Sequence, residues 1–255
     1  MKKSLKSQPE PPCLERYRTL NPQASWDQFR DDSDACYKTL RVQCRTDQRG
    51  LCAYCEISLT PENEQIAHFH PKSDTSTAHN WALDWDNLWL ACKGGTQSWM
   101  NNEENYREPL PENRSCDEST EARVLDGVTL SPAEVPPFPR IFRFEQRPDA
   151  LEIHPDESHC TEAGLSKDKV ARTITEYNLN CGRLSEARLR VYRPIEQIMR
   201  QVREKNVNSP AALMRLAQIH LGPSADGRWG KFFTLVRWRL GKIAEDYLAS
   251  ISYAG

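Results

Sequence analysis

Four cysteines restrict the fold of this chain more than any other feature. Cys52 and Cys55 stand in the segment CAYC, a spacing that lets one tight turn aim two thiolates at the same point. Cys92 and Cys116 are the best placed further ligands, because both border the stretch 101–115, which is too polar to pack and is predicted to be an exposed loop. We therefore predict a structural zinc bound by these four residues. The alternative is that they are small buried side chains, which is common for free cysteine.

The other cysteines and the composition narrow the class of protein. The first residues, MKKSLKSQPEPPC, contain lysines but no apolar segment, so we expect a cytoplasmic protein with reduced thiols rather than a disulfide framework. No window has the apolar length of a membrane span, and the mean hydropathy is −0.74. The net charge of −2 means that any contact with nucleic acid needs a local basic face. The thiols predicted to be ordinary core or surface groups are Cys13, Cys36, Cys44, Cys160 and Cys181.

The hydrophobic pattern divides the chain into three parts. Residues 1–50 are predicted to form an arm or loose cap and then one or two amphipathic helices between Trp26 and Arg49. Residues 51–130 combine short strand-like pieces with polar turns and hold the clustered metal-ligand types. Residues 131–255 begin with a proline-rich linker, continue with a small hairpin around QRPD, and end in a helical subdomain. We expect an α+β fold that is mainly helical.

Two histidines follow the CAYC turn in the segment QIAHFHPKS, which begins like a strand. Alternate side chains of a strand share a face, so His68 and His70 are predicted to point the same way, an arrangement that suits metal binding or proton transfer. A lone histidine is more often structural, and the alternation beside a thiolate cluster favours a functional role. Asn87 stands just before LWL, where an asparagine typically caps a helix or holds a turn through its side chain.

The order of these motifs resembles the HNH endonucleases, which have a ββα-metal core and a zinc knuckle. The segments LCAYCE, IAHFHPKS, LDWDNLWLACKG and CDES are most similar to the PtuB nucleases of Septu and retron-associated anti-phage systems. The resemblance implies that His68 is the general base that activates water and that Asn87 fixes the active loop. It places Asp117 where this fold usually has a ligand of the catalytic metal, Mg²⁺ or Mn²⁺, for which a carboxylate is suited. His70 is the second candidate ligand.

The same resemblance implies partners. They are a DNA substrate, an ABC-type ATPase, PtuA, and in retron versions a reverse transcriptase with its msDNA. Helical regions at both ends would then flank the HNH core. No Walker-type nucleotide-binding loop is present in this chain, so ATP would be bound by the partner.

One position departs from the HNH pattern. The residue before the catalytic histidine is usually an acid that also binds the metal, and here it is Ala67. His70 or Glu64 replaces that ligand, or the chain is a poor nuclease, or the sequence carries an inactivating change. Two hypotheses follow: a metal-dependent endonuclease, and an inactive zinc-stapled adaptor that binds DNA or the ATPase. A thiol redox enzyme is disfavoured, because the βαβ pattern that accompanies such a motif is absent from the sequence.

Basic residues and tryptophans leave two further questions. Lys72 and Lys93 flank the proposed site and are candidates for phosphate contacts. Trp81, Trp85 and Trp89 are four residues apart and are predicted to line one helix face, which packs the module onto the helical subdomain or a partner. The C-terminal cations either track a DNA backbone or pair with nearby glutamates. These cations are Arg183, Arg188, Arg190, Arg193, Arg200, Arg203, Arg228, Lys231, Arg237, Arg239 and Lys242.

Overall fold

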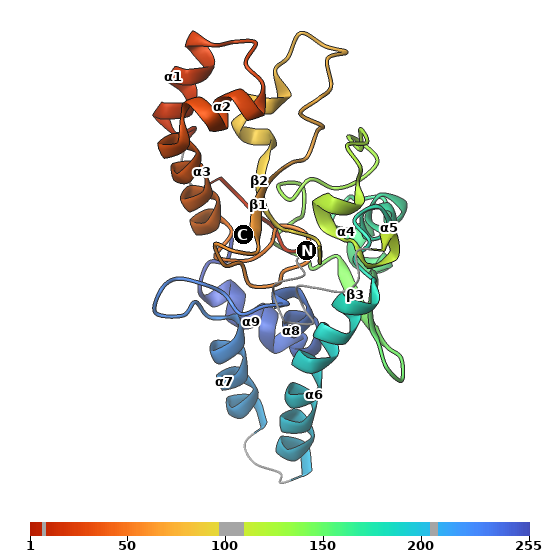
Figure 1. The fold of residues 1–255 in the computed structure, drawn as a ribbon. Helices are drawn as coiled ribbons and strands as arrows, with labels where there is room; N and C mark the ends of the chain where they lie inside the picture. Colours follow the sequence, from red (N-terminus) through yellow and green to blue (C-terminus); the bar gives the residue numbers. More distant parts are fainter. Residues whose placement is uncertain (7–8, 97–109, 205–208) are drawn as a thin grey trace.

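The computed structural model of the chain describes residues 1–6, 9–96, 110–204 and 209–255. Helices α1 to α3 lie at one end of the molecule, the hairpin β1–β2 lies near its middle, and helices α6 to α9 lie at the other end (Figure 1). The described elements are α1 (Pro12–Leu20), α2 (Trp26–Asp32), α3 (Asp34–Asp47), β1 (Glu64–His68), β2 (Leu88–Cys92), β3 (Phe142–Gln146), β4 (Leu151–Pro155), α4 (Glu157–Glu162), α5 (Lys167–Glu176), α6 (Gly182–Glu204), α7 (Ser209–Leu221), α8 (Phe233–Leu240) and α9 (Lys242–Ser250). The fold is mixed and mainly helical, as predicted.

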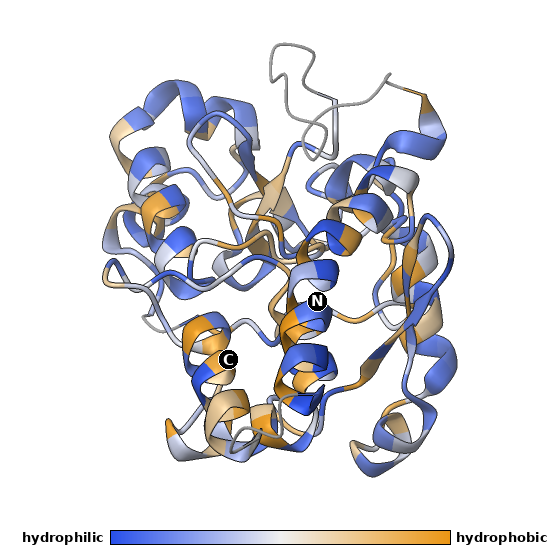
Figure 2. Ribbon diagram, turned by 90° about the horizontal axis from the view of Figure 1, so that it is seen from below, coloured by the Kyte–Doolittle hydropathy of each residue, from blue (hydrophilic) through white to orange (hydrophobic). Residues whose placement is uncertain are grey.

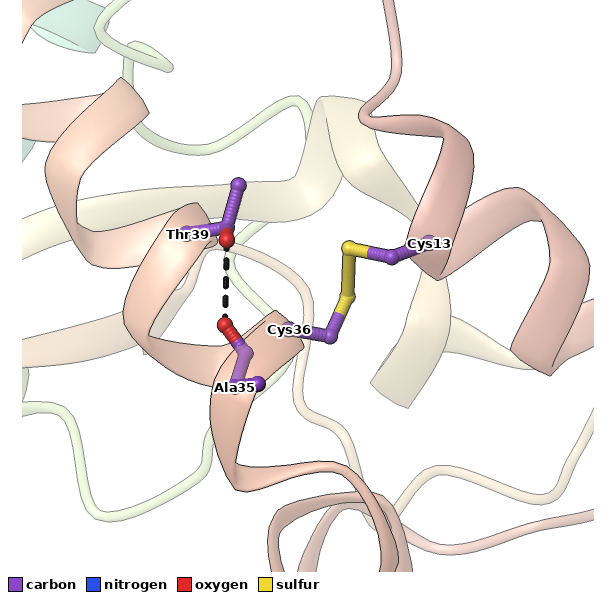
Figure 3. The surroundings of a disulfide bond; sticks show 4 residues. All are labelled: Cys13, Ala35, Cys36 and Thr39. Atoms are coloured by element: carbon purple, nitrogen blue, oxygen red, sulfur yellow. Dashed lines mark hydrogen bonds between the residues drawn. A yellow bond between two sulfur atoms is a disulfide. The ribbon is translucent and has the colours of Figure 1, made fainter.

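The N-terminal helices pack against the hairpin and against one another. Helix α2 begins with a capping box, in which the Ser25 side chain accepts from the Gln28 N–H and the Gln28 side chain accepts from the Ser25 N–H. A disulfide joins Cys13 of α1 to Cys36 of α3 (Figure 3). The prediction of reduced thiols is therefore wrong for this pair. Helix α1 folds back so that the two Cα atoms lie 5.8 Å apart, within bonding range, and a separation of 23 residues in sequence does not reveal this.

Residues 1–6 are packed into the fold, so the prediction of a loose arm is wrong for them. Met1 is 3% exposed, and its amino group lies 3.0 Å from the carboxylate of Glu56. The Lys6 ammonium lies 3.6 Å from the centre of the Trp85 ring, a cation–π contact. The polar composition of the segment concealed this, because lysine can bury its methylene stem while its charge finds a partner.

The hairpin β1–β2 carries the central part of the site. Its strands are antiparallel, with Glu64 opposite Cys92 and His68 opposite Leu88, so the strand predicted in QIAH is confirmed. All five residues of β2 are buried, because α3 covers this strand and the chain packs on both of its faces. The register places the last residue of β1 beside the first residue of β2.

The predicted helix face of three tryptophans is wrong. Trp81 and Trp85 begin two separate 3-10 turns, η1 (Trp81–Leu83) and η2 (Trp85–Asn87), and Trp89 lies in β2. Each turn begins with a polar side chain that accepts a backbone N–H two residues on: Asn80 from residue 82 at 3.1 Å, and Asp84 from residue 86 at 3.0 Å. These local hydrogen bonds compete with a continuous helix.

The structure shows the hairpin of the expected ββα core but not its helix. In the described part of 51–130, every helical turn is a short 3-10 segment, and the last of them are η3 (Pro111–Asn113) and η4 (Cys116–Ser119). Most of the predicted exposed loop 101–115 lies outside the described residues. The chain returns to the hairpin through η4, which contacts β2.

The C-terminal half has the predicted hairpin and helices. Strands β3 and β4 pair antiparallel, α5 packs on β4, and α8 packs on β3. Apolar side chains of all three predicted parts of the chain share one core, and helices α6 to α9 enclose a second core. Figure 2 shows the apolar and polar stripes of the helices around it. Within the described ranges, no helix combines the length and apolarity that a bilayer crossing requires.

Candidate metal centre and adjoining cavity

The four predicted cysteines meet in the interior. Their sulfur atoms lie within 4.8 Å of one another, and the side chains are at most 3% exposed. The Sγ–Sγ distances are 3.8 Å for Cys52–Cys116, 3.7 Å for Cys55–Cys92 and 3.7 Å for Cys92–Cys116. A tetrahedral zinc with Zn–S bonds of about 2.3 Å has sulfur–sulfur edges of about 3.8 Å. The four residues therefore fit a zinc ion in number, chemistry and spacing.

Backbone geometry brings two distant turns to this point. The first turn is closed by the Glu56 N–H, which donates to the Cys52 carbonyl at 3.1 Å. The Cys92 N–H donates to the Cys52 sulfur at 3.3 Å, as expected for a thiolate acceptor. Gly94 follows with φ of +60°, and a Cβ there would lie 2.6 Å from the Ser115 carbonyl oxygen. Glycine therefore lets the second turn approach the segment that carries the fourth cysteine.

Two buried arginines balance the charge of this centre. Four thiolates around Zn²⁺ carry a net charge of −2, and Arg183 and Arg188 of α6 are only 1% and 2% exposed. Burial opposes the charge of Arg183, yet the surrounding cysteines, Cys92 first among them, raise the pKa of this guanidinium above its ordinary value. Arg188 also donates to the Leu179 carbonyl at 2.6 Å. These two arginines therefore belong to the interior and not to a DNA-facing surface.

A cavity of about 750 Å³ adjoins the centre, and we call it the His68 cavity. Its walls come from three separate parts of the chain: the helices α2 and α3, the strand β1, and the segment 114–123. Lys72 and Lys93 also line it, as their positions beside the predicted site suggested. The lining residues used below are Trp26, Arg30, Tyr37, Arg41, Glu64, Gln65, His68, Lys72, Lys93, Asp117, Glu118 and Arg123.

His68 lines this cavity, and one of its ring nitrogens is engaged by the backbone. Its Nε2 lies 3.1 Å from the Ala82 carbonyl oxygen, and because a carbonyl only accepts, Nε2 carries the hydrogen. The other nitrogen, Nδ1, is then the acceptor of the neutral ring. Burial, the largest cause, lowers the pKa of His68 to about 4, and the charge of Lys72 acts in the same direction. The imidazole is therefore neutral at pH 7.

Two carboxylates lie together in the lining of the cavity. The Gln65 amide donates to Asp117 at 3.2 Å and to Glu118 at 2.8 Å, which holds the two acids side by side. Burial, and next the charge of Glu118, raise the pKa of Asp117 to about 7. Carboxylate oxygens are the ligands that Mg²⁺ and Mn²⁺ prefer, so the lining offers suitable donors for such an ion.

Asn87 joins the two sides of the loop after β1. Its Oδ1 accepts the His70 N–H at 2.6 Å, and its Nδ2 donates to the carbonyls of His70 and Trp81, each at 2.9 Å. The side chain is 5% exposed, so these bonds are shielded from water. This is the geometry expected of an asparagine that fixes a loop.

His70 does not share the face of His68. Its ring nitrogens each lie 2.8 Å from a carboxylate, Nδ1 from Asp126 and Nε2 from Asp74, and its ring stacks on Trp81. The prediction that the two histidines point the same way is wrong, because the strand ends at His68 and the alternation stops there. In the described structure, His70 is not part of the lining of the His68 cavity.

The structure also bears on the missing acid of the HNH pattern. Ala67 is fully buried and lies opposite Trp89 in the hairpin. Glu64 borders the cavity, but its carboxylate accepts from Arg41 at 2.8 Å and from the Arg45 Nε at 2.9 Å. Both residues that might have replaced the acid, His70 and Glu64, are therefore engaged with other partners.

Sequence patterns did not identify several residues of the cavity. Trp26, Tyr37 and Arg41 belong to the N-terminal helices, which were predicted only as a flank, and no local motif links them to His68. Gln65 had a detectable signal, since it lies in the same predicted strand.

Among the C-terminal cations, the structure shows pairing with glutamates, in the pairs Arg190–Glu186, Arg203–Glu196, Arg239–Glu196 and Arg237–Glu245.

A closed cysteine centre beside a cavity lined by a histidine and carboxylates is an arrangement typical of metal-containing hydrolases. No protein-family model matches this chain. A protein of Escherichia coli described as "Retron Ec83 putative HNH endonuclease" is 35% identical to it over 196 residues, covering 69% of this chain and 73% of that protein. The chain belongs to the family of this retron-associated HNH endonuclease.

Proposed function

We propose that this protein is a metal-dependent HNH endonuclease that hydrolyses phosphodiester bonds of DNA. The observation that carries the proposal is the position of His68, whose neutral ring lines the same cavity as Asp117, in a chain of the HNH family. The zinc bound by the four cysteines has a structural role, because the cluster is closed.

Each side chain has a distinct task in this reaction. His68 takes a proton from the attacking water at Nδ1, and the Ala82 carbonyl stabilises the imidazolium through Nε2–H. Asp117, with Glu118 beside it, would hold Mg²⁺ or Mn²⁺, which supplies charge for the scissile phosphate and the leaving oxygen. Lys72 lines the same cavity and neutralises a phosphate.

The biological setting is proposed from the family. The protein acts as the effector of an anti-phage system of the PtuB type, together with the ABC-type ATPase PtuA and, in a retron, a reverse transcriptase with its msDNA. The support is that the relative is named as part of a retron. A protein without a nucleotide-binding loop would depend on such a partner for control.

A second candidate is an inactive adaptor that binds DNA or the ATPase. Ala67 favours it, since the usual acid is missing and the residue is fully buried. The adaptor would keep the cysteine centre and the cavity but not the reaction.

Cleavage of plasmid DNA with Mg²⁺ or Mn²⁺, with and without the partner ATPase, separates the two. His68→Ala should lower the rate by about 10²- to 10⁴-fold, the usual contribution of a general base. His79→Ala is the matched control, because His79 pairs with Asp84 outside the cavity lining. Ala67→Glu should raise the rate of a weak nuclease.

Two results would count against the proposal. Cleavage by His68→Ala at the wild-type rate would remove the base. Absence of cleavage in both the wild type and Ala67→Glu, with the partner present, would favour the adaptor.

A further inference from the structure

We propose that Trp26 is a positioning residue for His68: its indole, delivered by α2, holds the imidazole so that Nδ1 faces the cavity. The inference rests on the proposed function, since it assigns a partner to the general base. It also makes the N-terminal helices a working part of the site, although the HNH motifs begin only at residue 51.

The contact is an edge-to-face packing of two rings. The ring centroids of Trp26 and His68 lie 4.6 Å apart, and the ring planes meet at 88°. The hydrogen bond from Nε2 to the Ala82 carbonyl fixes one atom of the imidazole but not the plane of the ring. Because the indole stands against the ring, tilting about that hydrogen bond is blocked. The two contacts together determine where Nδ1 points.

Trp26 is itself held firmly. It is 5% exposed and packs against Phe29 at 5.3 Å and Tyr37 at 5.9 Å between ring centroids. It is the first residue of α2, directly after the Ser25 capping box, so the backbone that carries it is anchored. The disulfide joins α1 to α3, the helices that precede and follow α2 in the chain. A side chain fixed in this way can orient another, because moving it would unpack the aromatic cluster.

The contact is apolar, so it acts by shape and by exclusion of water. Lys72, from the following loop, is the charged group that acts on His68, and further charged side chains of the cavity lining come from α2 (Arg30), α3 (Arg41), β1 (Glu64) and the segment 114–123 (Asp117 and Glu118). The indole itself meets the imidazole as a ring-to-ring contact. Removing it would let the imidazole tilt and would admit water to a face that is now closed.

The test compares Trp26→Ala, Trp26→Leu and Trp26→Phe in the full-length, zinc-loaded protein. Leu14→Ala is the matched control, because Leu14 of α1 is fully buried in the same core but belongs neither to the aromatic contacts that hold Trp26 nor to the lining of the His68 cavity. Nitrogen-15 NMR of the imidazole, with the His68 signal assigned from His68→Ala, reports the tautomer. Cleavage assays give kcat and KM.

We expect a single Nε2–H tautomer in the wild type and Leu14→Ala, and averaged nitrogen shifts in Trp26→Ala and Trp26→Leu. In these two variants kcat should fall tenfold or more while KM changes less than twofold, and Trp26→Phe should recover most of the loss. If Trp26→Ala does not fold, Trp26→Leu, which keeps more volume, decides the question.

An unchanged tautomer and kcat in the folded Trp26 variants would overturn the proposal, as would an equal fall of kcat in Leu14→Ala. The proposed function fails separately, if His68→Ala cleaves as fast as the wild type. Since the tautomer is measured without substrate, it tests the role of Trp26 whether or not the protein cleaves DNA.

Discussion

The cysteine centre and the His68 cavity are neighbours in the chain and in space, but the centre excludes solvent whereas the cavity leaves space for it. At the centre, four sulfurs within 4.8 Å of one another fill the site and are almost entirely buried. One residue after Cys116, Asp117 lines a space of about 750 Å³. Structural metal sites are closed, whereas catalytic sites keep an open position. The difference supports the proposed division of roles, in which the cysteines maintain the shape and the cavity holds the reaction.

The two regions also differ in how their charge is balanced. The centre is matched by arginines of α6 that are as buried as the cysteines. The cavity is lined by cations that are partly exposed, among them Arg30 and Lys72. These side chains remain accessible to a phosphate group. We therefore expect changes at the centre to affect folding and changes at the cavity to affect the rate.

The largest effect should come from the centre. Cys92→Ser or Cys116→Ser should abolish zinc binding and unfold the chain, because a structural zinc contributes on the order of 10 kcal/mol, comparable with the whole stability of a domain. Metal analysis and circular dichroism measure this. Cys160→Ser is the control, a thiol that is 1% exposed but outside the cluster. A Cys92→Ser protein that keeps its zinc and its melting temperature would contradict the structural role of the cysteine centre.

The next effect should come from the charge balance. Arg183→Met leaves half of the charge of the centre uncompensated and should lower the free energy of unfolding by about 3–5 kcal/mol, the usual cost of breaking a buried charge pair. Arg190→Met in the same helix removes a half-exposed pair with Glu186 and should cost at most about 1 kcal/mol. Urea unfolding compares the two. If the two substitutions lower the free energy of unfolding by the same amount, the buried charge of Arg183 does not stabilise the centre.

A third effect separates the cavity wall from the centre. Cys13→Ser with Cys36→Ser opens a link across 23 residues and should cost about 3 kcal/mol, the loop-closure value for this length. We expect the zinc content to stay at one ion per chain, since the disulfide lies on the side of the N-terminal helices. Urea unfolding and metal analysis measure both quantities. Loss of zinc in the double variant would mean that the two regions are not independent.

The smallest effect concerns pH and the cavity alone. The pKa of His68 is about 4 in the folded chain, below its ordinary value of 6.5, so the unfolded chain binds a proton first as the pH falls. His68 therefore has no effect on stability at pH 8 and should destabilise the fold by about 1 kcal/mol at pH 5.5. Unfolding in urea at both pH values, for the wild type and His68→Gln, isolates this contribution. A pH dependence that is the same in both proteins would contradict it.

Sequence patterns predicted the parts that depend on local chemistry. Cys52 and Cys55 were identified from their spacing, Cys92 and Cys116 from their places beside the polar loop, the strand at His68 from alternation, and the position of Asn87 from the turn that it enters. The second hairpin was also predicted, because a short polar turn between two alternating segments is a local signal. Apart from the meeting of the two cysteine pairs, each of these features is encoded within a few consecutive residues.

Other parts became visible only in the folded chain. The direction of His70 depends on Asp126, which lies 56 residues away, and the disulfide depends on how α1 folds back on α3. The packing of Trp26 on His68 joins elements that no motif connects. The sequence by itself predicted that four cysteines come together and which strand carries His68. The tertiary structure decided what surrounds them, because packing across long separations follows from the whole core and not from any single segment.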